Sequence, residues 1–230
     1  MIKAEFFVQL IGASFFLILN IYLAKKGFSD AEIANFISYR FLAIMLLAFP
    51  LGVYIKGKPL KPFFILGSLG VPIVALSLVL AIENMWHQYL PYLFILWGIV
   101  FTLFQISSLP YIMRNTVTEN QSHAISLNYA THSFGTILSG ILIFGFGNLM
   151  QEINEGLILL SISLFGFIGI HYIMKMKVDI VPPLKEELEN KKYNWILLLK
   201  AIIPTLIIAI GAGLTIPFIN LFFYHNFEVD

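Results

Sequence analysis

The 230-residue sequence contains no cysteine and few charged residues. Without cysteine there are no disulfides, no thiol catalysis and no cysteine-ligated metal. The absence of cysteine also leaves the redox state of the protein's compartment undetermined. Charged residues make up 12% of the chain, about half the share usual in a soluble domain, whereas 59% are hydrophobic. The net charge of +1 provides no basic face for phosphates, which excludes nucleic acid as a partner. Because the chain has so few polar groups, we predict that lipid rather than water surrounds much of its surface.

Long apolar stretches separated by short polar joints indicate a polytopic helical membrane protein. About 20 apolar residues cross the hydrocarbon as a helix, and backbone in lipid must satisfy its own hydrogen bonds. The stretches are too long and too uniformly apolar for barrel strands. The sequence therefore predicts an all-α bundle of about seven transmembrane helices, at about 5–24, 31–54, 62–82, 89–113, 123–150, 156–174 and 201–224, the last preceded by an interfacial turn at 193–199.

The segment 175–194, KMKVDIVPPLKEELENKKYN, is charged and contains a Pro-Pro pair. We interpret it as a cytoplasmic linker between a six-helix N-terminal domain, 1–174, and a seventh helix within 195–230. With the N-terminus in the cytoplasm, the inner segments carry ten Lys and Arg residues and the outer loops carry only Lys25 and Lys26. Six helices, an inner loop and one more helix look like the start of a second, missing block. We therefore expect a natural truncation or a fragment.

Three stretches carry a family resemblance. In 27–62, a glycine and a cluster of cations follow the second span; in 109–140, a basic residue, Arg114, follows the fourth; in 203–223, glycines come early and a proline lies near the outer end. Their order and spacing resemble the major facilitator superfamily of secondary transporters, which has two six-helix halves and a cytoplasmic N-terminus. The acidic residue of the family's first inner loop is absent here, and Tyr54 with Ile55 occupies that region.

This resemblance implies transport by alternating access. The first, second, fourth, fifth and seventh helices would line the cavity, and the third and sixth would face lipid. It also implies a cytoplasmic gating loop containing Gly52, Lys56, Gly57, Lys58 and Lys61.

Polar side chains within the spans are the candidate site residues, because at membrane depth they usually face a bundle interior or a water-filled cavity. Arg40 lies about 14 Å along the second span and is either an anion-binding or gating residue, or a structural arginine that snorkels or pairs with Glu32 or Asp30. Asn128 and His132 are four residues apart and share a helix face. The candidates for lining a substrate cavity are Gln9, Asn20, Arg40, Gln105, Asn128, His132 and Asn220.

Histidine exchanges protons near neutral pH, so His132 could carry a coupling proton or could simply be hydrogen-bonded within the bundle. We predict a multi-pass transporter of a small neutral or anionic solute in the cell membrane, most simply a bacterial inner membrane. Its partners are the lipid bilayer, the solute and a coupling proton or ion. No cofactor, metal site or catalytic residue is predicted.

Three alternatives to a transporter remain, and the sequence supports them to different degrees. A non-transporting fragment or scaffold follows if the gene ends at Asp230. A seven-helix photoreceptor is disfavoured because Lys200 lies near the inner edge and the third span has no acid. An intramembrane enzyme is disfavoured because there is no glycine-flanked serine motif and no His-Glu-x-x-His.

Overall fold

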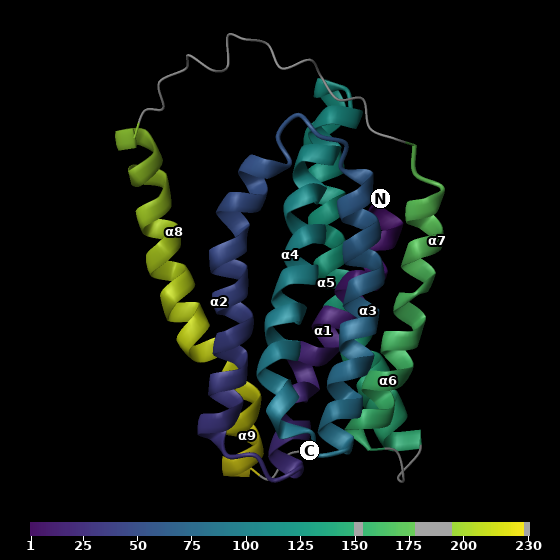
Figure 1. Ribbon diagram of the computed structural model, residues 1–230, viewed down its shortest axis with the longest axis vertical. Helices are drawn as coiled ribbons and strands as arrows, with labels where there is room; N and C mark the ends of the chain where they lie inside the picture. Colours follow the sequence, from purple (N-terminus) through teal and green to yellow (C-terminus); the bar gives the residue numbers. More distant parts are fainter. Residues whose placement is uncertain (150–153, 178–194, 228–230) are drawn as a thin grey trace. The chain divides into compact units, whose positions relative to one another are not determined.

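The computed structural model describes residues 1–149, 154–177 and 195–227 (Figure 1), and these residues form helices and connecting turns, with no strand among them. The helices, including two 3-10 turns, are α1 Ile2–Lys25, α2 Asp30–Tyr54, α3 Lys61–Glu83, η1 His87–Tyr89, α4 Leu90–Asn115, α5 Thr118–Leu149, α6 Glu155–Gly166, α7 Ile168–Met174, α8 Trp195–Thr215, η3 Ile216–Phe218 and α9 Ile219–Phe227. Seven stretches of this helical structure are long and apolar enough to cross a membrane. The prediction of a polytopic all-α membrane protein is confirmed.

The ends of the helices follow local signals in the sequence. At the start of α2, the Ser29 hydroxyl accepts from the Glu32 N–H, while the Glu32 carboxylate accepts from the Ser29 N–H at 2.9 Å, which is a capping box. The turn before it contains Gly27 at φ +89°, a conformation that glycine adopts without a steric penalty. Pro62 lies in the first turn of α3, where its missing N–H costs no helical hydrogen bond.

Two helices differ from the predicted spans. α5 begins at Thr118 rather than at residue 123, because the polar residues 118–122 continue the helix beyond the apolar stretch. The sixth span is divided at Phe167 into α6 and α7. Hydropathy detects the length of an apolar stretch, whereas the helix follows its backbone hydrogen bonds.

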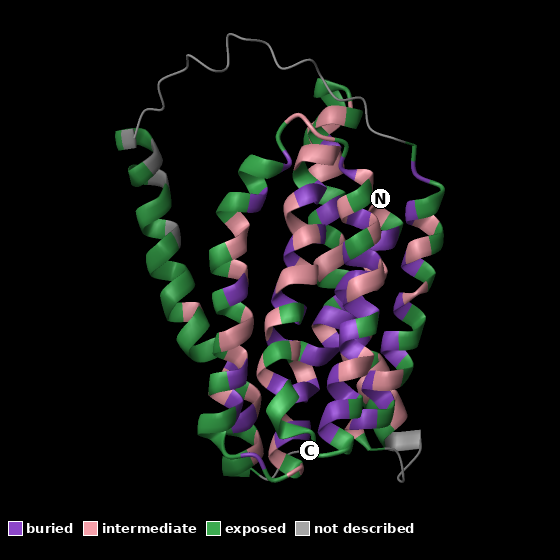
Figure 2. Cartoon of the chain, viewed as in Figure 1, coloured by how far each residue is buried: buried purple, intermediate pink, exposed green. Residues whose placement is uncertain are grey.

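α1 is the most deeply buried of the spans and packs against α3, α5, α6 and α7 (Figures 1 and 2). α4 packs against α2 and α3. Gly98 permits the close approach of α4 to α2, since a Cβ there would lie 2.5 Å from the Arg40 carbonyl oxygen. These contacts combine the helices from α1 through α7 into one unit, which extends to Val181.

Residues 182–230 form a second unit, which we describe by itself. The predicted single helix at 201–224 is interrupted: α8 ends at Thr215, and the 3-10 turn η3 precedes α9. Pro217 lies in that turn, and it has no N–H for a helical hydrogen bond. Trp195 already begins α8, so residues 195–199 are helical rather than an interfacial turn. Most of the predicted linker, 178–194, lies outside the described residues, and the domain division stays a prediction.

Candidate functional site

A buried carboxylate lies at the centre of the polar residues in the spans. Glu5, on α1, is 0% exposed. Its Oε1 is 3.1 Å from His132 Nε2 and accepts from Asn128 Nδ2 at 3.4 Å, while its Oε2 accepts from Ser108 Oγ at 3.1 Å. α1, α4 and α5 thus all contribute to this group, which we call the Glu5 cluster: Glu5, Gln9, Ser108, Asn128 and His132.

Gln9 extends the cluster by one helical turn. Its Nε2 is 3.3 Å from the same His132 Nε2 atom that faces Glu5. An imidazole nitrogen is a donor when it carries a proton and an acceptor when it does not. His132 Nε2 can therefore donate to Glu5 or accept from the Gln9 amide, but one protonation state serves only one of these partners.

Three predicted site residues, Gln9, Asn128 and His132, meet in this cluster. Sequence reasoning missed Glu5, because a carboxylate near the start of a span resembles an ordinary first-turn residue. A signal was available: Glu5 and Gln9 are four residues apart, as are Asn128 and His132. Two such pairs in two spans indicate facing polar surfaces.

The cluster has an unsatisfied acceptor and a shallow groove beside it. Asn128 is 8% exposed, and its Oδ1 has no hydrogen-bond partner among the described residues. A buried polar atom without a partner is costly, so it marks a place where a donor would be stabilised. The groove has a volume of about 360 Å³ and is lined by Ile2, Lys3, Phe6, Phe7, Thr131 and Tyr172. Burial lowers the pKa of the neighbouring Met1 amino group, and the Glu5 carboxylate acts in the opposite direction.

Arg40 lies elsewhere, between aromatic rings. Its guanidinium carbon is 5.7 Å from the centre of the Trp97 ring and 5.6 Å from that of Phe101, within the range of a cation–π contact. Its Nε is buried without a hydrogen-bond partner among the described residues. Glu32, one of the two residues expected to pair with Arg40, instead forms a hydrogen bond with Ser29. Aromatic faces hold the cation but do not neutralise it, so it can still receive an anion.

The other three predicted cavity residues do not join the Glu5 cluster. Asn20 is buried on α1, about 22 Å from Glu5 by helix rise. Gln105 is half-buried on α4, one turn before Ser108, and it has no hydrogen bond to the cluster within the described part of the chain. Asn220 lies on α9, in the second unit.

The predicted gating loop is fastened to its neighbours. Arg114 Nη1 donates to the Lys58 carbonyl at 2.7 Å, and Lys61 Nζ donates to the Met176 carbonyl at 2.6 Å. Gly57 has φ +69°, which favours glycine. Gly52 has open space around it, and Lys56 is exposed. These bonds anchor the loop to α4 and to the end of α7; a gating role stays a prediction.

A second carboxylate lies at the far end of α1. Glu83 Oε1 accepts from the Tyr22 hydroxyl at 2.6 Å, and Glu83 Oε2 accepts from Lys26 Nζ at 2.6 Å. Lys25 pairs with Glu155 at 2.7 Å. We call these residues the outer clamp, since they tie α1 to α3 and α6. No group of three possible metal ligands occurs within the described ranges.

The fold is similar to the crystal structure of a bacterial homolog of the human lysosomal transporter Spinster, solved in an inward-facing and unoccupied conformation. The TM-score is 0.73 at 14% sequence identity, and the similarity covers 100% of this chain and 55% of that protein. The chain thus spans just over half the length of its structural relative. No protein-family model and no curated protein matches the sequence. The similarity is one of fold, and it agrees with the predicted polytopic all-α architecture.

Proposed function

We propose that this multi-pass membrane protein, with its major facilitator fold, forms part of a secondary transporter that moves a small solute by alternating access. The observation that carries the proposal is the Glu5 carboxylate, buried within a span and surrounded by polar side chains from two other spans. Ionisable groups within membrane spans are expensive and usually belong to substrate or ion pathways. The similarity of the fold to that of a solved transporter also supports a transport function.

The Glu5 cluster is the proposed proton-coupling site. With a proton on Nε2, His132 donates to Glu5; without it, Nε2 accepts from Gln9. In the tautomer that carries its proton on Nδ1, gain of a second proton at Nε2 would therefore change which residue of α1 holds α5. Helices that exchange discrete partners are the kind of element on which a conformational transition depends.

Arg40 is the proposed contact for an anionic group of the solute. It contributes a cation within a span, and its aromatic neighbours hold the guanidinium without supplying negative charge. The unsatisfied Asn128 oxygen offers an acceptor for a donor on the solute or on water. A small solute with an anionic group fits these features best. Residence in a bacterial inner membrane, with the N-terminus in the cytoplasm, remains part of the proposal.

Reconstitution tests the transport proposal. The protein encoded by the complete reading frame is placed in proteoliposomes with a pH-sensitive dye inside, and a panel of small neutral and anionic solutes is added. We expect at least one solute to accumulate under an imposed proton gradient and to change the luminal pH. Uptake without a pH change would remove the coupling step but leave transport; flat uptake across the panel would count against transport itself.

Arg40→Ala tests the solute contact, with Arg40→Lys as the matched variant that keeps the charge. Loss of a charge-assisted hydrogen bond should raise KM for an anionic solute by roughly tenfold or more. Lysine should restore part of this loss, and a neutral solute should be unaffected by either change. Equal kinetics in Arg40→Ala and the wild type would remove Arg40 from the site.

A further inference from the structure

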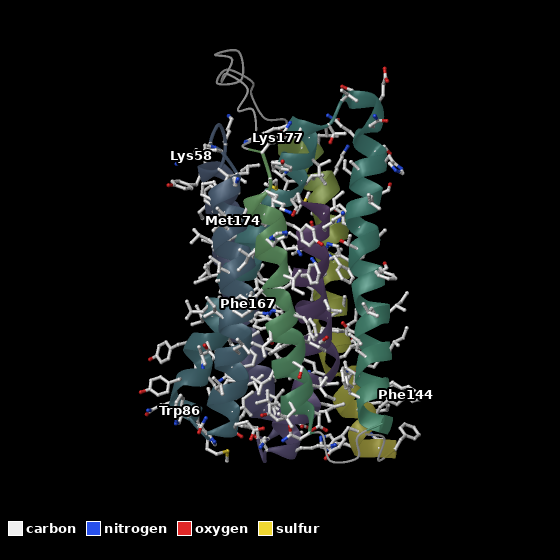
Figure 3. All side chains as sticks on the ribbon, turned by 90° about the vertical axis from the view of Figure 1, so that its right-hand side faces the viewer. Lys58, Trp86, Phe144, Phe167, Met174 and Lys177 are labelled. Carbon is white, nitrogen blue, oxygen red and sulfur yellow. The ribbon has the colours of Figure 1, made fainter. Side chains whose placement is uncertain are left out.

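Tertiary contacts join two basic segments at one end of the unit that extends to Val181. Lys61 Nζ donates to the carbonyl oxygens of Met174 and Met176, at 3.1 and 2.6 Å. The end of α7 is therefore held against the loop between α2 and α3. Figure 3 shows Lys58, Met174 and Lys177 near this same end, opposite Trp86. We call the side chains of Lys56, Lys58, Lys175 and Lys177 the inner basic patch.

Most of the charge in this patch is not neutralised by the described part of the protein. Lys56, Lys175 and Lys177 are exposed and form no ion pair with another described residue. Lys58 Nζ lies over the Tyr54 ring, 3.1 Å from its centre, which leaves its positive charge in place. Lys61, in contrast, is engaged with the two carbonyls. The patch therefore attracts anions.

An apolar groove lies beside the patch, on the residues that follow Lys58 in the sequence. Pro59, Lys61, Pro62, Ile65 and Leu66 line a surface groove of about 490 Å³. Leu66 is 57% exposed, on a helix that is long and apolar enough to cross a membrane. Lys61 connects the two features, because its side chain lines the groove while its ammonium group reaches the end of α7.

We propose that this place binds one anionic phospholipid of the surrounding leaflet. The headgroup phosphate would contact the inner basic patch, and one acyl chain would lie in the groove along α3. Basic residues beside a membrane span attract anionic lipid, and the attraction decays within a Debye length, so it acts on headgroups at the membrane surface. The apolar groove favours a lipid over a free phosphate, because only the lipid brings hydrocarbon. The inference does not depend on the proposed transport function.

Native mass spectrometry of the whole chain in detergent tests this site, with phosphatidylglycerol and phosphatidylcholine of the same acyl chains as probes. We expect the wild type to bind phosphatidylglycerol more tightly. In the variant Lys175→Gln/Lys177→Gln, affinity for phosphatidylglycerol should fall by about fivefold for each lysine removed. The matched control Lys191→Gln/Lys192→Gln removes the same charge from the far end of the predicted linker 175–194, outside the described residues, and should keep wild-type affinity. Equal binding of the two lipids, or an equal loss in the control, would overturn the proposal.

A second variant separates a lipid from a free anion. Leu66→Trp should fill the groove, weaken phosphatidylglycerol binding and leave binding of inorganic phosphate unchanged. If Leu66→Trp binds phosphatidylglycerol as tightly as the wild type, the groove holds no acyl chain and the proposal fails. Melting temperatures in detergent check that each variant is folded; because Lys175, Lys177 and Leu66 are exposed, we expect wild-type values.

Discussion

Glu5 and Glu83 are two carboxylates near opposite ends of the unit that extends to Val181, and their surroundings differ in kind. The Glu83 side chain is 32% exposed and contacts a lysine ammonium and a tyrosine hydroxyl. The Glu5 side chain is 0% exposed and contacts a serine, an asparagine and a histidine. A lysine ammonium only donates hydrogen bonds, whereas a histidine ring nitrogen donates or accepts according to its tautomer.

We therefore expect Glu83 to act as a structural tie between helices and Glu5 to belong to a group whose hydrogen-bond partners can change. In the outer clamp, Lys26 and Tyr22 both donate to Glu83, so one set of hydrogen bonds holds α1 against α3. The Glu5 cluster has no lysine or arginine in its described contacts, and its histidine reaches two residues of α1. We therefore expect changes at Glu5 to affect coupling and changes at Glu83 to affect stability.

The largest expected effect is on proton coupling. Glu5→Gln keeps the size and hydrogen-bonding capacity of the side chain but removes the carboxylate. We expect solute-dependent change in luminal pH to be abolished in proteoliposomes, because His132 loses its carboxyl partner. Glu83→Gln should keep the coupling. Equal coupling in wild type and Glu5→Gln would show that the two carboxylates do not differ in this way.

The next effect is on the packing around the outer clamp. A Cβ at Gly156 would lie 2.7 Å from Glu83 Oε1 and 2.8 Å from the Tyr22 hydroxyl oxygen. Gly156→Ala should therefore lower the free energy of unfolding by about 2 kcal/mol, seen as a lower melting temperature in detergent. Gly140→Ala is the control, since a Cβ there meets nothing within 4 Å and alanine favours the helix. Similar melting temperatures for the two variants would contradict close packing at Gly156.

The smallest effect is electrostatic. Glu83→Gln should reduce the free energy of unfolding by about 1 kcal/mol, because a partly exposed ion pair contributes little. The difference from wild type should shrink at about 1 M salt, where the Debye length is roughly 3 Å. Any stability difference of Glu5→Gln should persist in salt, since Glu5 is shielded from solvent. Melting curves at low and high salt measure the stability differences of both variants from wild type. If the difference for Glu83→Gln does not change with salt, Tyr22 rather than Lys26 is the important partner.

Much of the fold and part of the site could be predicted from the sequence. Spans are local properties of the chain, since roughly 20 apolar residues suffice to define one. The i, i+4 spacing of Asn128 and His132 is local as well, and it located one side of the Glu5 cluster. The partners of Lys61, Lys26 and Arg40 were not predicted, because these side chains find them on other helices.

Composition and periodicity alone determined a helical membrane protein with about seven spans, because the lack of charge and the length of the apolar stretches leave no other way to satisfy the backbone in lipid. Only the tertiary structure decided which carboxylate is enclosed. Glu5 and Glu83 both lie close to the ends of apolar stretches. The spacing of Glu5 and Gln9 indicates a shared polar face, but it does not say whether that end of the helix is enclosed. α5 packs against α1 and α4 contributes Ser108, so Glu5 is enclosed by neutral donors and a histidine, whereas Lys26 reaches Glu83 at the surface.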